Sequence, residues 1–96
     1  MILEIENAAG AYLGEHPAEM TTVYDALPHI QLAFPDLGED AVSVSLQEMD
    51  GSTYVIVSIP WRGSVDCGRA RLRSFDDSYW LAADRDLNVI VDLGFI

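Results

Sequence analysis

The clearest pattern in the chain is an alternation of apolar and polar residues over positions 42–47. The apolar members are Val42, Val44 and Leu46, and the polar members are Ser43, Ser45 and Gln47. A period of two is typical of a β-strand with one buried and one solvated face. Asp50 and Gly51 follow, and this pair readily adopts the positive φ angles of a type I′ turn. Residues 54–59 are β-branched and aromatic on both faces, so the sequence predicts a hairpin whose second strand is the more central one.

The same alternation returns near the end of the sequence. Over 87–95, the residues that share one face are Leu87, Val89, Val91, Leu93 and Phe95. This pattern predicts a third strand. An edge strand presents unpaired backbone groups, and this one ends in the apolar pair Phe95 and Ile96. We therefore expect a homodimer in which this strand pairs with a second copy across a two-fold axis.

Helical spacing marks the first segment. Apolar residues recur at intervals of three and four at Ile2, Ile5, Ala9, Tyr12 and Leu13. This interval predicts an amphipathic helix that stops at Gly14. An alternative stays open for residues 1–5, which also suit a short edge strand, because Gly10 weakens the helix.

Pro17 suits the first position of a second helix. The expected inward face consists of Met20, Val23, Tyr24, Leu27, Ile30 or Gln31, and Phe34. Pro28 falls inside this pattern, and its ring removes one backbone hydrogen bond. We therefore expect the helix to kink or restart near Leu27 and to end at Phe34, before a polar turn over 36–40.

Two interpretations fit residues 64–75. Ser64 suits the N-cap of a helix. Two charge pairs then have helical spacing, Asp66 with Arg69 and Arg73 with Asp77. The alternative is a strand with a basic outer face, in which Arg69, Arg71 and Arg73 alternate with Ala70 and Leu72. We favour the helix because it gives the cap and both charge pairs a role.

The expected order of elements is helix, helix, strand, strand, helix, strand. We therefore expect one globular domain over 1–96, of the two-layer α+β class, with a three-stranded, mainly antiparallel sheet and the helices packed on one face. A length of 96 residues suits a single core. The N-terminal segment lacks the basic residues of a signal peptide, and no apolar run is long enough for a membrane helix, so we expect a cytoplasmic protein.

Charge is distributed unevenly along the chain. It has 16 acidic residues, five arginines and no lysine, which give a formal net charge of −11 at pH 7. No arginine precedes Arg62, whereas ten carboxylates do. Such acidity opposes binding to nucleic acid and to anionic membranes and favours a basic partner protein. The absence of lysine excludes Walker A ATPases and Schiff-base enzymes. Solvation in a salt-rich environment is an alternative cause of the acidity.

The residue types that carry catalysis or bind metals are sparse. Cys67 is the only cysteine, which excludes an internal disulfide, and we expect it to be a small buried or half-buried residue. His16 and His29 are too few for a histidine metal triad. Four carboxylates are candidates for acid–base or metal chemistry if they converge on a cleft: Asp76, Asp77, Asp84 and Asp86. Aspartates also populate turns, so we expect no catalytic residue, no metal and no cofactor.

Aromatic and basic side chains occur together only in the second half of the chain. The candidate partner-binding residues are Trp61, Arg62, Arg69, Arg73, Tyr79 and Trp80. Tryptophan and arginine are enriched at the centres of protein interfaces. The alternative is that these aromatic rings pack over the edge of the core.

These features predict a non-enzymatic interaction module. It would be a small acidic protein that binds a basic partner protein by charge complementarity, as an inhibitor, an antitoxin-like neutraliser or an adaptor. The alternative is a self-associating protein, either a small-ligand-binding or a structural homodimer, whose charge serves only solubility. An enzyme built on the four aspartates is the third hypothesis.

Overall fold

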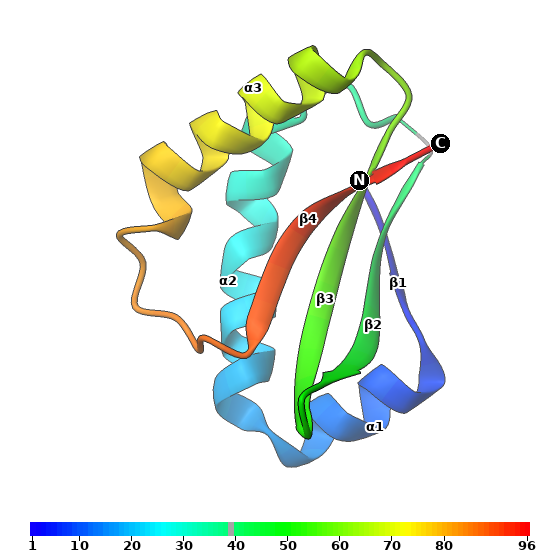
Figure 1. The fold of residues 1–96 in the computed structure, drawn as a ribbon, viewed down its shortest axis with the longest axis vertical. Coiled ribbons are helices and arrows are strands. Elements are labelled where there is room, and N and C mark those ends of the chain that lie inside the picture. Colours follow the sequence, from blue (N-terminus) through cyan, green and yellow to red (C-terminus); the bar gives the residue numbers. More distant parts are fainter. Residues whose placement is uncertain (39) are drawn as a thin grey trace.

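In the computed structural model, which describes residues 1–38 and 40–96, three α-helices lie on one face of a mixed four-stranded sheet (Figure 1). This arrangement confirms the expected α+β class. The elements in chain order are β1 (Ile2–Ile5), α1 (Asn7–Glu15), α2 (Pro17–Ala33), β2 (Ala41–Met49), β3 (Ser52–Trp61), α3 (Val65–Phe75), a π-helical turn (Asp76–Trp80) and β4 (Val89–Phe95). The polar turn expected over 36–40 includes residue 39, which lies outside the described residues.

The strands lie side by side in the order β1, β2, β3, β4. β2 and β3 are antiparallel, whereas β1 is parallel to β2 and β4 is parallel to β3. The expectation of three mainly antiparallel strands is therefore wrong in both number and pairing. The cause is the connections: α1 and α2 return the chain from β1 to the start of β2, and α3 does the same between β3 and β4. A helical crossover of this kind joins parallel strands.

Residues 1–5 account for the additional strand. Leu3 and Ile5 pack against the core, whereas Ile2 and Glu4 are exposed on the opposite side of the sheet. This alternation has the period of a strand, and α1 begins only at Asn7. The expected helix over this segment is wrong, and the alternative of a short edge strand is confirmed. The spacing of Ile2 and Ile5 suits a helix, but pairing with β2 forms a strand in which these two side chains lie on opposite faces.

Helix α2 runs continuously from Pro17 to Ala33, so the expected restart near Leu27 is wrong, and the expected kink stays a prediction. The side chain of Pro28 is exposed, while Ala26 and Ile30 on either side of it are fully buried. Packing of these residues against the sheet stabilises the helix across the missing hydrogen bond, because most helical stability in proteins comes from tertiary contacts.

The predicted hairpin is confirmed. Asp50 and Gly51 have φ angles of 53° and 81°, as a type I′ turn requires. The turn sets the register, in which Val44 faces Val57 and Ser43 faces Ser58. Successive side chains alternate between the two faces of a strand. In this register the paired valines therefore point toward the helices, and the paired serines point away from them.

Helix α3 is also confirmed in place of the rival strand. Ser64 caps it, since its Oγ accepts a hydrogen bond from the backbone N–H of Cys67 at 3.2 Å. The side chain of Cys67 itself is exposed, so the expected burial of this cysteine is wrong.

The ion pairs differ from those expected on α3. Within the described part of the chain, the arginines that form ion pairs are Arg62 with Asp40 and Arg71 with Asp36. The expected pairs within the helix and its C-terminal turn are therefore not formed. Both observed pairs instead tie the region around α3 to the loop before β2.

Replacing Ser64 by alanine is expected to lower the free energy of unfolding by about 1 kcal/mol, because the N–H of Cys67 loses its acceptor. Urea denaturation followed by circular dichroism would measure the change. Ser74→Ala is the matched control, since Ser74 is exposed within the same helix. Equal stability of the two variants would contradict the capping role of Ser64.

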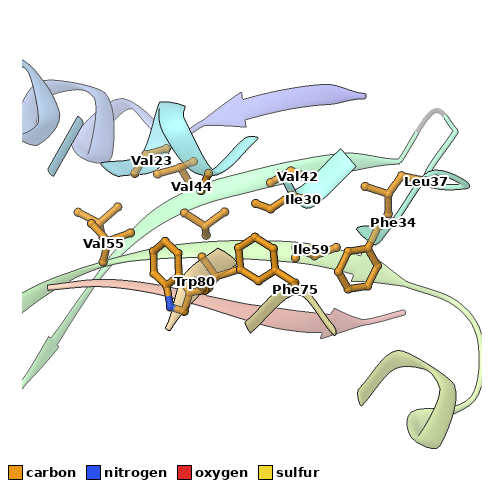
Figure 2. Close-up of a cluster of buried hydrophobic side chains, with 14 of the residues drawn as sticks. Val23, Ile30, Phe34, Leu37, Val42, Val44, Val55, Ile59, Phe75 and Trp80 are labelled. Atoms are coloured by element: carbon orange, nitrogen blue, oxygen red, sulfur yellow. The ribbon is translucent and has the colours of Figure 1, made fainter. Parts of the chain in front are cut away.

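The hydrophobic core fills the space between the sheet and the helices (Figure 2). Phe34, Trp61, Phe75 and Trp80 supply its largest aromatic side chains, and Val42, Val44, Val55, Val57 and Ile59 line it from the sheet. All of the sheet residues in this list lie on the same side of their strands. The opposite side of the sheet carries no part of this core.

Candidate binding surface

The face of the sheet that points away from the helices has no element packed on it within the described part of the chain. We call it the open face. Its residues, taken strand by strand, are Ile2 and Glu4, then Ala41, Ser43, Ser45 and Gln47, then Tyr54, Ile56, Ser58 and Pro60, and finally Ile90, Asp92 and Gly94. Small and polar side chains predominate, so this side of the sheet is accessible from solvent.

One polar row crosses all the strands of the open face. Strand register places Glu4 beside Ser43, Ser43 beside Ser58, and Ser58 beside Asp92. Two hydroxyl groups are thus flanked by one carboxylate on each side. Neighbouring side chains in such a row lie about 5 Å apart at Cβ, close enough for a single bound group to contact more than one of them.

A hollow of about 460 Å³ lies at one end of this row. Its lining consists of Glu4, Asp40, Ala41, Ser43, Ser58, Pro60, Gly94, Phe95 and Ile96. Gly94 keeps it open, because a Cβ at this position would lie 2.5 Å from Oγ of Ser58. The lining contains two carboxylates, two serine hydroxyl groups and no arginine, together with apolar side chains such as Phe95 and Ile96.

Asp40 at the rim of the hollow already has a partner. The guanidinium of Arg62 donates two hydrogen bonds to its carboxylate, at 2.9 and 3.1 Å. These bonds hold the pKa of Asp40 below its ordinary value, and a hydrogen bond from Arg71 does the same for the pKa of Asp36. In the part of the chain that the structure describes, Glu4 and Asp92 have no such arginine partner. The polar row therefore ends in two carboxylates that are available to a cation.

The candidate aromatic residues are engaged inside the protein. Trp61 and Trp80 are buried, and Nε1 of Trp61 donates to the carbonyl of Ser64 at 2.8 Å. Tyr79 stacks on His29, with ring centroids 3.6 Å apart. This burial matches the alternative in which the rings pack on the core, and it leaves little of them for a partner.

The candidate arginines lie in two separate places. Arg62 is held by Asp40 beside the open face, while Arg69 and Arg73 are exposed on α3. The structure therefore does not gather these arginines and the aromatic rings into one patch. Partner binding by Arg69 and Arg73 stays a prediction, and the open face offers the more complete set of groups.

The four candidate aspartates do not converge. Asp76 lines a groove beside β4, whereas Asp84 and Asp86 line a separate hollow with Thr22 and Arg85. Among the described residues, no group of three histidine, cysteine, aspartate or glutamate side chains is arranged to hold a metal ion.

Burial raises the pKa of Asp76, and the nearby carboxylate of Asp77 raises it further, while Arg85 lowers it. Replacing Asp76 by asparagine is therefore expected to raise the melting temperature at pH 7. With its pKa raised in the folded state, the ionised carboxylate destabilises the fold above that pKa. The penalty disappears below the ordinary pKa, where the group is protonated in both states.

Melting curves at pH 7 and pH 3 would test this prediction, with a gain expected only at pH 7. Asp84→Asn at an exposed position that does not affect the pKa of Asp76 is the control for overall charge. An equal gain from both variants would assign the effect to the net charge of the protein and not to the burial of Asp76.

One polar cluster was not predicted from the sequence. Glu19 is only 5% exposed, and its Oε1 accepts hydrogen bonds from the Tyr12 hydroxyl at 3.2 Å and from the Asn88 amide at 3.5 Å. Burial and the bond to Glu19 raise the pKa of Tyr12. Its spacing could have indicated this burial, because Glu19 precedes Val23 by four residues and both side chains therefore lie on the inward face of α2. This cluster joins α1, α2 and the residue before β4; Glu19 is buried, Tyr12 is half-buried and Asn88 is exposed.

No helix in the described residues is both long enough and apolar enough to cross a membrane. Comparisons of the chain with protein-family models, with curated proteins and with solved structures find no match.

Proposed function

We propose that this protein is a small acidic binding module that holds a basic segment of a partner protein on the open face of its sheet. The observation that carries the proposal is the hollow beside Ser43 and Ser58, which has carboxylates in its lining and no arginine. Inhibition or neutralisation of a basic protein is the role that such a module would perform.

Electrostatics supports a cationic ligand. The formal net charge of −11 attracts basic proteins over long range and accelerates their encounter with the module. At short range, the Glu4 carboxylate lies beside Ser43 in the polar row, and Asp92 lies beside Ser58. A lysine or arginine side chain donates hydrogen bonds only, and every side-chain group in this row can accept them.

The size of the hollow is also suitable. Its volume of about 460 Å³ lies within the range of about 300 to 1,000 Å³ that is typical of small-ligand pockets. One long basic side chain would fit there with its charged end at the hydroxyl groups. The exposed apolar side chains of Phe95 and Ile96, which line the hollow, would contact the aliphatic part of such a side chain.

A defined peptide tests the proposal. The probe is a hexapeptide of alternating arginine and valine, acetylated and amidated at its ends, titrated into ¹⁵N-labelled protein. We expect the amide resonances of Ser43, Ser58 and Gly94 to shift, and Kd to rise several-fold from low salt to about 0.5 M salt. Shifts confined to the helices, or a Kd that is independent of salt, would refute the proposal.

Two double variants locate the binding charge. Glu4→Gln with Asp92→Asn removes the carboxylates at the ends of the polar row, and asparagine keeps the oxygen that accepts the Leu93 N–H. We expect Kd to rise by about 2- to 30-fold, the sum of two exposed ion pairs. Glu15→Gln with Glu48→Gln is the matched control, because these exposed residues lie off the open face. It has the same net charge and should leave Kd nearly unchanged.

A further inference from the structure

Among the described residues, strand β4 lies at the edge of the sheet and pairs only with β3. The carbonyl of Asn88 accepts from Val55, and the N–H of Ile96 donates to Trp61. In a parallel pair, every second residue directs its N–H and C=O groups to the neighbouring strand, and the residues between them direct these groups away from it. Because Asn88 and Ile96 bond to β3, the even-numbered residues of β4 also face β3. Val89 and Val91 therefore direct their backbone groups to the free edge.

Two of the backbone N–H groups that point to the free edge of β4 have hydrogen-bond acceptors. The N–H of Val89 donates to the carbonyl of Asp86 at 3.2 Å, and the N–H of Leu93 donates to the side chain of Asp92 at 2.8 Å. Among the described residues, the N–H of Val91 has no partner. A donor and two acceptors, the carbonyls of Val89 and Val91, are thus presented together on the free edge.

A groove of about 330 Å³ runs beside this part of the edge. Its lining consists of Asp76, Trp80, Leu81, Arg85, Leu87, Val89, Ile90 and Val91. Leu81 and Leu87 are 64% and 77% exposed, so these apolar walls are open to solvent, and Asp76 and Arg85 add one negative and one positive side chain to the lining. The guanidinium of Arg85 lies 5.0 Å from the centroid of the Trp80 ring and bonds to the Trp80 carbonyl, which holds this wall in place.

Asp76 adds a charge to the groove. Its carboxylate is partly buried, and it has no ion-pair partner within the described part of the chain. Burial is the main reason why the pKa of Asp76 is raised, and Asp77 and Asp92 add to it, while Arg85 opposes it. A cation brought by a ligand would stabilise the ionised carboxylate.

We propose that this groove binds an extended, basic segment of the partner protein, which adds to the sheet as a further strand beside β4. The backbone of the segment pairs with the outward groups of Val89 and Val91, and one arginine or lysine side chain reaches Asp76. In strand addition of this kind, backbone hydrogen bonds provide affinity and flanking side chains provide specificity. The inference rests on the proposed function, from which it takes the basic nature of the partner. It adds how the backbone of the partner segment is bound.

Charge selects this occupant over a second copy of the chain. An antiparallel pair of β4 strands would bring Asp76 and Asp92 of two molecules to one edge, and each molecule has a net charge of −11. Like charges on adjacent strands are destabilising. A basic segment meets the same carboxylates with opposite charge.

Backbone chemistry provides the test. The probes are the alternating arginine and valine hexapeptide and the same peptide with one valine amide N-methylated, which removes a backbone donor and keeps the charge. We expect the N-methyl peptide to bind about 2- to 10-fold more weakly. Amide hydrogen exchange of Val91 should slow on addition of the unmodified peptide, because its N–H gains an acceptor.

Variants at Asp76 test the charge contact. We expect Asp76→Asn to weaken binding of the hexapeptide several-fold, while Asp77→Asn at the exposed neighbouring position weakens it less. Circular dichroism would establish that both variants are folded. Equal weakening by both variants would exclude a specific contact at Asp76.

The remaining outcomes separate this inference from the proposed function. If Ser43 and Ser58 respond to the peptide while Val91 does not, and both peptides bind equally, strand addition is overturned and the open-face function stands. If neither peptide binds at low salt, both proposals fail. If Val91 is protected in the protein alone and light scattering gives twice the monomer mass, a second copy occupies the edge and the inference is overturned.

Discussion

Replacing Phe75 by alanine should lower the free energy of unfolding by about 3–5 kcal/mol. Phe75 is the last residue of α3 and is fully buried, with its ring centroid 5.8 Å from that of Trp80. Truncation removes its buried apolar surface and leaves a cavity that the sheet and helices can close only in part. Urea denaturation followed by tryptophan fluorescence and circular dichroism would measure the loss.

Leu32→Ala is the control for this prediction. The Leu32 side chain is 79% exposed, so its truncation should change stability by less than about 0.5 kcal/mol. If the alanine variant at Phe75 does not fold, Phe75→Leu retains most of the apolar volume and should give a smaller, measurable loss. A Phe75 variant as stable as Leu32→Ala would contradict the burial of Phe75 in the core.

Gly68→Ala should destabilise the protein by about 1–3 kcal/mol, although alanine favours helices. A Cβ at this position would lie 2.7 Å from Nε1 of Trp61 and 3.1 Å from Cδ1 of Leu93. The indole cannot simply move away, since Nε1 donates to the carbonyl of Ser64. The close approach of α3 to the end of β3 therefore requires glycine.

Gly14 provides the opposite case in α1. No atom lies within 4 Å of a Cβ built there, so Gly14→Ala should stabilise the protein by about 0.5–1 kcal/mol through helix propensity alone. The two substitutions are chemically identical, and their opposite signs in urea denaturation would isolate the effect of packing on Trp61. A gain in stability from both would contradict the close approach at Gly68.

Patterns among near neighbours were sufficient for several elements. The alternation over 42–47 predicted β2, the Asp50 and Gly51 pair predicted the turn, and Ser64 predicted the start of α3. Each signal depends on backbone preferences or on a hydrogen bond that spans only a few residues. Such signals can be recognised without knowing what the element packs against.

The candidate site was less accessible to sequence patterns. The acidity of the first half predicted a basic partner, but the aromatic residues chosen as contacts, Trp61 and Trp80, are in the core. An aromatic residue at the end of a helix or strand can lie either in the core or on the surface, and the positions of the neighbouring elements decide which. Glu19 shows the same limit, because a charged residue on an inward face is assigned to solvent by default.

Local residue chemistry alone was enough to define the α+β class, the hairpin, the capped helix and the net charge, because each depends on composition or on residues close in the chain. Tertiary structure decided that residues 2–5 form a strand, that the outer pairings are parallel, and that the polar row from Glu4 to Asp92 lies on an uncovered face. These features depend on register and on the side of the sheet that the helices occupy. Both are set by contacts between residues far apart in sequence, which periodicity within a segment does not encode.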